Sequence, residues 1–270
     1  MGLSAPQGGR RGHILNFDSR YIVVATACFL IGIFVSPYAQ FIFGINQSSP
    51  RLSAGLAEAQ FCRMDWSAHV WSPARLRLID PCAKVSGTII EGPPSDEHDG
   101  DVKIFVSLDS QFASIVNDVN RNELNGSLVV EIIAVDVPGV DIPDEGVHAT
   151  LYGALVVDLA EGWVELHPAW TIQILDVDST LKDNSNSTAV VDATITRMTN
   201  QTTTQLSGAF VFFELADPSG RATQWIFSRT DRTGLAEATF GNLKPGDYTL
   251  RVYARQLGHS GFSELTFTAA

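Results

Sequence analysis

Basic residues are scarce in this 270-residue chain, which has 18 lysines and arginines against 30 aspartates and glutamates. The formal net charge is -12. The first 20 residues run against this trend, because three arginines and one aspartate give them a charge of +2, which leaves -14 for the rest. Nucleic acids and anionic lipid surfaces are usually bound through clusters of lysine and arginine. The acidic bulk of the chain therefore disfavours a nucleic-acid partner.

Familiar catalytic signatures are also missing. The chain has no Gly-x-Ser-x-Gly, His-Glu-x-x-His, paired Cys-x-x-Cys, P-loop or dinucleotide-binding pattern. No enzyme family is therefore indicated by a local motif.

Cysteine is rare, with three in the whole chain. Cys28 lies in an apolar run, where it is most simply a small apolar residue. Cys62 and Cys82 lack the close spacing of a zinc knuckle. Outside a membrane, oxidising conditions permit these two to form a disulfide, which would clip the irregular segment 61–80 onto the first domain. Two unpaired thiols are the alternative.

Charge is absent from one long segment, residues 21–45, which forms an uncharged apolar run of 25 residues. A bilayer core requires about 20. Arginines precede the run and none follows before Arg51, so the positive-inside rule places residues 1–20 in the cytoplasm and everything after the run outside. A cleaved signal peptide is the alternative, but the residues around Pro37 fit a cleavage site poorly. We therefore expect a single-pass cell-membrane protein.

The outer part divides at two polar stretches. Residues 46–60 are typical of a stalk, and residues 176–188, which include the run LKDNSNST, indicate an interdomain linker. Between them, residues 61–175 predict a small five-stranded barrel, with one helix over 111–119 where apolar residues recur at helical spacing. Its expected strands are rich in Val, Ile, Leu and Thr and cover 82–91, 102–108, 128–134, 147–157 and 163–175.

Residues 189–270 predict a β-sandwich, which makes the chain mainly β. Six short segments alternate with turn signals at 189–198, 208–214, 223–229, 234–240, 246–254 and 263–268. Within the run TDRTGLAEATFGNLKPGDYTLRVYA, Leu243, Pro245, Gly246 and Tyr248 predict a tight turn before the strand that contains Leu250. This run resembles the closing strands of prokaryotic immunoglobulin-like modules of the bacterial Ig or carboxypeptidase-regulatory-like kind. The resemblance covers about the last 80 residues and implies a spacer or adhesive role without a catalytic motif.

The first domain resembles an OB-type barrel. The resemblance rests on GTII from Gly87, Asp99-Gly100-Asp101, LVVEII from Leu128, LYGALVVD from Leu151 and GWVELHP from Gly162. The block that starts with HVWSPARL at His69 is also similar to an uncharacterised family of prokaryotic, membrane-anchored extracytoplasmic domains, which implies no known activity. Two departures stand out. The expected helix precedes the third strand instead of following it, and Lys103 stands where relatives carry histidine.

Carboxylates and imidazoles gather in the first domain and form a candidate ligand or metal site of His69, Asp99, Asp101, Glu131, Asp158, Glu165 and His167. Such groups hold divalent metals or carry out acid and base steps. Strand alternation in WVELHP places Glu165 and His167 on one face and Val164 and Leu166 on the other. The alternative is a set of solvent-facing residues, with His167 hydrogen-bonded to nearby backbone.

Two tryptophans of the first domain, Trp71 and Trp163, are candidate aromatic contacts, because such rings stack on sugars or anchor protein partners. Core packing is the alternative. These observations predict a non-enzymatic cell-surface protein that is anchored through residues 21–45 and binds a protein or carbohydrate, without a cofactor. The alternative is a metal-dependent hydrolase, a nuclease-like one included, that uses the acidic and histidine face with a divalent metal.

Overall fold

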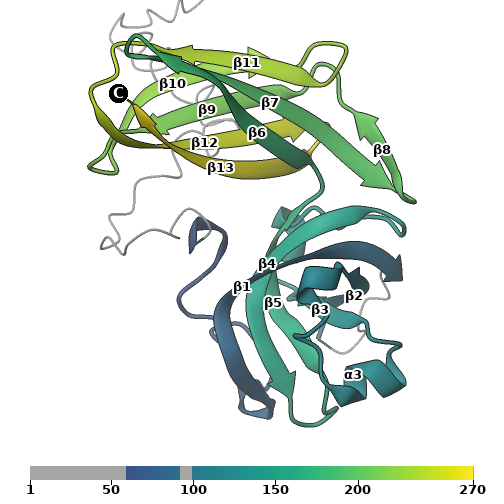
Figure 1. Ribbon diagram of the computed structural model, residues 1–270. Helices are drawn as coiled ribbons and strands as arrows, with labels where there is room; N and C mark the ends of the chain where they lie inside the picture. Colours follow the sequence, from purple (N-terminus) through teal and green to yellow (C-terminus); the bar gives the residue numbers. More distant parts are fainter. Residues whose placement is uncertain (1–58, 92–98, 270) are drawn as a thin grey trace, which may run out of the picture. The chain divides into compact units, whose positions relative to one another are not determined.

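The computed structural model describes residues 59–91 and 99–269 (Figure 1). The predicted cytoplasmic tail (1–20), membrane helix (21–45) and most of the predicted stalk (46–60) lie outside these residues. Within the described ranges, no helix has the length and apolar character needed to cross a bilayer.

Five strands form a closed barrel in the order β1-β2-β3-β5-β4, in which β4 pairs with β1. The β3–β5 pair is parallel, and the other four neighbouring pairs are antiparallel. The barrel strands are β1 Leu76–Glu91, β2 Val102–Leu108, β3 Leu128–Ile132, β4 His148–Asp158 and β5 Val164–Gln173. These positions agree with the five predicted strands, except that β1 begins six residues earlier than expected.

Alternating apolar residues explain why these segments close into a barrel. Ile104 on β2, Val130 on β3 and Leu166 on β5 are fully buried and belong to one core inside the barrel. Successive residues of a strand point to opposite faces. The side chains of Lys103 and Glu131 therefore point outward. So do those of Trp163, Glu165 and His167.

The cap, defined here as residues 59–75, covers part of the outer face of the barrel. It contains two short 3-10 helices, η1 Ala59–Phe61 and η2 Pro73–Arg75. Its Val70, together with Cys62 and Trp66, packs against a small apolar cluster formed by Leu76, Ile133, Ala154, Val156 and Trp170. The Cys62–Cys82 disulfide, present as expected with a Cα–Cα distance of 5.6 Å, ties the cap to β1.

The helix predicted over 111–119 is wrong in its position. The structure has a 3-10 turn, η3 Ser110–Phe112, and then a short helix, α3 Asp118–Glu123. Asn117 sets the start of α3, because its side chain accepts hydrogen bonds from the backbone N–H groups of Val119 and Asn120. A further 3-10 turn, η4 Val137–Gly139, follows β3.

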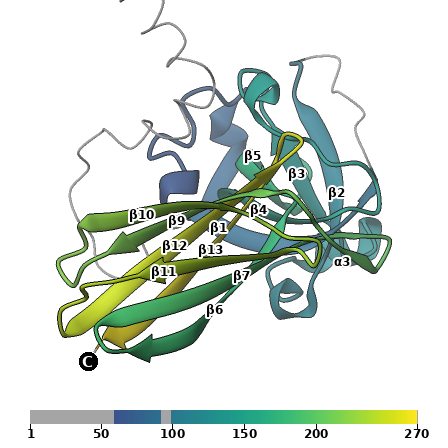
Figure 2. The same ribbon diagram turned by 90° about the horizontal axis from the view of Figure 1, so that it is seen from above.

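The remaining eight strands form two sheets that share one apolar core (Figures 1 and 2). One sheet has the order β10-β9-β12-β13, and the other has the order β11-β7-β6, with β8 also paired to β7. Their bounds are β6 Asp176–Ser185, β7 Thr188–Thr199, β8 Thr202–Gln205, β9 Phe210–Ala216, β10 Ala222–Arg229, β11 Leu235–Phe240, β12 Gly246–Gln256 and β13 His259–Ala269. Inward side chains from both sheets fill the space between them, as in a sheet-on-sheet packing.

The predicted linker over 176–188 is wrong as local structure, because most of it is strand β6. This strand pairs antiparallel with β7 along its length. It also contacts β13 of the other sheet, where the Asn184 side chain donates to the Thr268 carbonyl at 2.7 Å. Polar side chains dominate β6 because only a few of its residues, such as Val177 and Leu181, pack against the core. The segment therefore belongs to the sheets that follow it.

Candidate functional site

A row of charged side chains crosses the outer face of the barrel. Lys103 on β2 lies directly opposite Glu131 on β3. On the other side of β3, the parallel register pairs Val129 with Glu165 of β5. Continuing that register by two residues brings His167 beside Glu131. The row Lys103–Glu131–His167 thus follows from strand pairing and alternation.

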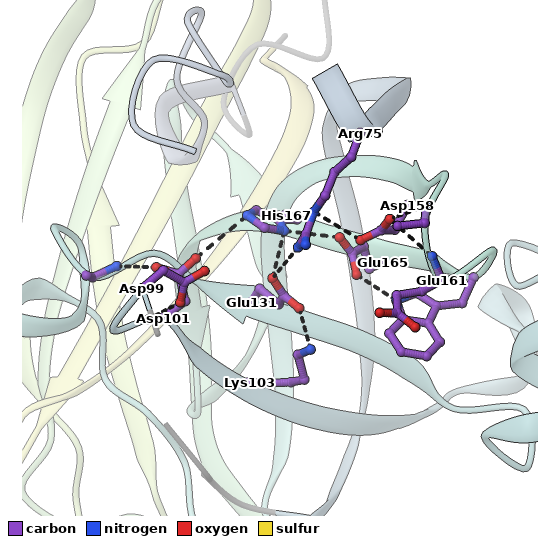
Figure 3. A network of polar contacts seen from close by, with 12 residues as sticks. Arg75, Asp99, Asp101, Lys103, Glu131, Asp158, Glu161, Glu165 and His167 are labelled. Atoms are coloured by element: carbon purple, nitrogen blue, oxygen red, sulfur yellow. Dashed lines mark hydrogen bonds and ion pairs between the residues drawn. The ribbon is translucent and has the colours of Figure 1, made fainter. Parts of the chain in front are cut away.

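His167 lies at the centre of this network (Figure 3). Its Nδ1 atom lies 2.8 Å from Glu131 Oε2 and 3.0 Å from Glu165 Oε1. The second oxygen of Glu131 accepts from the Lys103 ammonium at 2.8 Å. The relative exposure is 0% for His167, 4% for Glu131 and 0% for Glu165. Burial of charged groups at this depth requires such pairing, because each loses its hydration.

Two further side chains enclose the network. The Trp163 indole N–H donates to Glu165 Oε2 at 2.8 Å, and the Lys103 ammonium lies 5.7 Å from the centroid of the Trp163 ring.

Arg75, at the end of the cap, extends to the barrel, with its guanidinium 3.2 Å from Asp158 Oδ2 and 4.0 Å from Glu131 Oε2. Asp158 also accepts from the backbone N–H of Ala160 at 2.7 Å.

The protonation states follow from this pairing. Burial alone lowers the pKa of His167, but hydrogen bonds and charges from Glu131 and Glu165 outweigh it and raise the pKa to about 9. Burial likewise acts to raise the pKa of Glu131. Hydrogen bonds and charges from His167 and Lys103 reverse this and lower the pKa to about 2. At neutral pH the pair is therefore an imidazolium and a carboxylate.

Asp101 closes the network on the side opposite Glu165. Its Oδ1 accepts from the backbone N–H of Ala134 at 2.8 Å, and its own N–H donates to Asp99 Oδ1 at 3.1 Å. Burial raises the pKa of Asp101; the hydrogen bond from Ala134 opposes the rise, and the nearby Asp99 charge adds to it. Its Oδ2 faces His167 Nε2 across 3.8 Å.

The structure brings six of the seven predicted site residues into one region of the barrel. Asp101, Glu131 and His167 offer ligand atoms that all lie within 4.8 Å of one another. Asp99, Asp158 and Glu165 surround them through the contacts above (Figure 3). The seventh, His69, is exposed on the cap. The predicted backbone partner for His167 is replaced by two carboxylates.

The two predicted aromatic contacts differ in their surroundings. Trp163 is half-buried and holds Glu165, so it is a part of the network. Trp71 is 69% exposed, although its neighbour Val70 is buried in the apolar cluster under the cap.

Lys103 and Arg75 complete the network although neither was among the predicted site residues. Alternation contains a signal for Lys103, since Val102 and Ile104 on either side of it are buried. Nothing local indicates the role of Arg75, because its partners lie on β3 and at the end of β4.

This arrangement organises charge more readily than it moves protons. A general acid or base works best with a pKa near the working pH, whereas His167 and Glu131 are held well away from neutrality on opposite sides. Carboxylate and imidazole atoms are, in contrast, suitable ligands for a cation.

Comparison with known proteins adds little to this geometry. No protein-family model and no curated protein matches the chain significantly. Among solved structures, the chain is similar to the dimeric latent form of PorU from Porphyromonas gingivalis, with 13% identity and a TM-score of 0.29. The match covers 68% of this chain and 20% of the PorU chain, so the chain corresponds to about a fifth of that protein's length. A likeness this weak carries no argument about fold or function.

Proposed function

We propose that this chain is a membrane-anchored, extracytoplasmic binding protein, in which an OB-like barrel carries the ligand-binding face and an immunoglobulin-like sandwich extends or docks the assembly. The uncharged run 21–45 and the arginines before it support the anchor and its orientation. The acidic charge of the remaining chain favours a partner other than nucleic acid.

The strand order supports the OB-like assignment of the barrel. A closed five-stranded barrel with β1-β2-β3-β5-β4 order and a parallel β3–β5 pair is the arrangement that the sequence resemblance implies. OB folds bind ligands on the face of strands 2 and 3 and on the loops after strands 1 and 4. Lys103 and Glu131 lie on that face, Asp101 directly precedes β2, and Asp158 ends β4. The position of α3 before β3 remains a departure from an ordinary OB fold.

The binding role is supported mainly by the way in which the carboxylates of Glu131 and Glu165 are buried and paired. Both oxygens of Glu131 are engaged, one by Lys103 and the other by His167. Both oxygens of Glu165 are also engaged, by His167 and Trp163. A hydrolase would need one of these carboxylates to be open to a substrate or to an attacking water. The geometry thus favours a binding protein over the hydrolase alternative.

Trp71 supplies a suitable contact for a partner. Its side chain is exposed while the segment that bears it is fixed by Val70 packing and by the Cys62–Cys82 bridge. Rigidly presented tryptophans are common anchors of protein and carbohydrate recognition, because a large apolar surface is buried with little loss of conformational entropy.

Residue-specific photo-crosslinking tests this proposal. A photo-reactive phenylalanine analogue placed at position 71 of the full chain, in membranes of cells that make it naturally, is expected to yield a crosslinked product. The same analogue at position 257 is the matched control, because Leu257 is 94% exposed on the turn between β12 and β13. We expect no product there.

Equal products at both positions, or none at position 71, would contradict the binding role of the cap. Turnover of ester, peptide or phosphodiester substrates by the full chain would instead support the hydrolase.

A further inference from the structure

Two buried polar atoms face each other without a hydrogen-bond partner. Asp101 Oδ2 and His167 Nε2 are both inaccessible to solvent and lack a partner among the residues that the structure describes. They lie 3.8 Å apart, too far for a direct hydrogen bond. A buried unpaired polar atom destabilises the fold, so two at one place call for a bound water or ion.

The surroundings of His167 favour an ion. Its Nδ1 atom is engaged by Glu131 and Glu165 at 2.8 and 3.0 Å, which fixes the ring and aims Nε2 at Asp101. Metal-binding histidines almost always donate their other ring N–H to a carboxylate in this manner, because it orients the ring and makes the ligating nitrogen more basic. Asp101 is itself held by the backbone N–H of Ala134.

We propose that Asp101 Oδ2 and His167 Nε2 bind one divalent transition-metal ion, with Zn²⁺ as the best match, and that Glu131 is a positioning residue for His167. A mixed imidazole and carboxylate set suits zinc better than calcium or magnesium, which prefer oxygen ligands alone. The ion replaces the Nε2 proton.

The distances permit this ion with little movement. Two ligand atoms at zinc-bond lengths of about 2.0 to 2.1 Å in tetrahedral geometry lie about 3.3 Å apart. The observed separation of 3.8 Å therefore requires each side chain to move by roughly a quarter of an ångström. The half-buried carboxylate of Asp99, two residues from Asp101, adds negative charge on the same side.

The neighbouring cations are directed elsewhere. Lys103 bonds to Glu131 Oε1, and Arg75 bridges Asp158 and Glu131. Glu131 thus stands between the Lys103 ammonium and the imidazole ring, and its negative charge screens the ion from that ammonium. The inference deepens the proposed function by naming the class of ligand that this face takes, and it rests on that face being a ligand site.

Calorimetric titration of the full chain in detergent, freed of metal by a chelator, tests the proposal with Zn²⁺ alone as the probe. We expect one Zn²⁺ per chain and a loss of affinity of at least 10-fold in Asp101→Asn and in His167→Gln. Asp118→Asn is the matched control, since it makes the same chemical change at an exposed side chain of α3 that contacts Arg121 and belongs to no part of the site. Its affinity is expected to stay within threefold of the original.

A second readout reports ligation itself. Co²⁺ in place of Zn²⁺ is expected to give a visible absorption band that Asp101→Asn and His167→Gln abolish and Asp118→Asn keeps. Asp101→Asn preserves side-chain volume, so it remains informative if His167→Gln does not fold. Absence of Zn²⁺ binding to the original chain, or unchanged affinity in Asp101→Asn, would overturn the metal site. Crosslinking at position 71 with and without Zn²⁺ separates this failure from a failure of the binding role.

Discussion

Replacing Glu131 with glutamine is expected to lower the free energy of unfolding by about 3 kcal/mol. The change keeps the volume of the side chain but leaves the His167 imidazolium and the Lys103 ammonium without the carboxylate between them. Breaking a buried ion pair by removing one partner costs about 3 to 5 kcal/mol. We expect the lower end of this range, because Glu165 still contacts His167.

Denaturant unfolding of the full chain in a chelator measures this effect. Glu123→Gln is the control, because it makes the same chemical change on the exposed face of α3. Such a surface change should stay within about 0.5 kcal/mol. A loss below about 1 kcal/mol in Glu131→Gln would show that the buried pairing contributes little to folding.

Removal of β6 is expected to abolish cooperative folding of the C-terminal sheets. A fragment 174–270 keeps the strand and should melt in one sharp transition, whereas a fragment 189–270 should not. Without β6, strand β7 keeps β11 and β8 but loses one long antiparallel partner, and the core loses Val177 and Leu181. The bonds from Asn184 to Thr268 and from Ser263 to Ser179, which join β6 to the opposite sheet, are also lost.

Thermal unfolding of the two purified fragments, followed by circular dichroism, measures the difference. The longer fragment is the matched control, because both share every strand from β7 to β13. A cooperative transition in the shorter fragment at the same temperature would show that β6 is dispensable and that residues 176–188 act as a connector.

Most strands were predictable because one of their faces is apolar. In β2 and β7 buried apolar residues alternate with less buried ones, so local pattern alone identifies them. Strand β6 was not predicted because its residues are mostly polar and its conformation depends on pairing with β7. The helix was misplaced because Phe112 and Val116 pack against the barrel core at helical spacing although neither lies in an α-helix, while the Asn117 cap starts the α-helix later.

The sequence could predict only those parts of the site whose residues lie on the same strand. Alternation placed Glu165 and His167 on a common face, and the structure confirms this shared face. Glu131 reaches His167 through a parallel pairing that joins β3 and β5, which no local pattern specifies. Arg75 lies at the end of the cap, and no pattern in the barrel strands indicates its contact with Asp158. Long-range pairing therefore decides the membership of the network.

The dependence of stability on pH follows from the same ion pair. The raised pKa of His167 contributes stability that is fully present below pH 6.5 and is lost as the pH rises to about 9. The lowered pKa of Glu131 contributes stability that is present above pH 4.5 and is lost as the pH falls to about 2. The free energy of unfolding of the metal-free chain is therefore expected to be highest between pH 4.5 and 6.5, as far as these two groups determine it.

The central claim is that His167 and Glu131 form a permanent ion pair and do not act as an acid and base catalyst. The charge state of the His167 ring tests this claim most directly. Nitrogen-15 NMR of the full chain, labelled at histidine and kept metal-free, distinguishes the imidazolium from the neutral ring. We predict that both ring nitrogens of His167 carry a proton at pH 7 and that the ring becomes neutral only near pH 9. A neutral His167 ring at pH 7 would contradict the account, because it would leave a base available near neutrality.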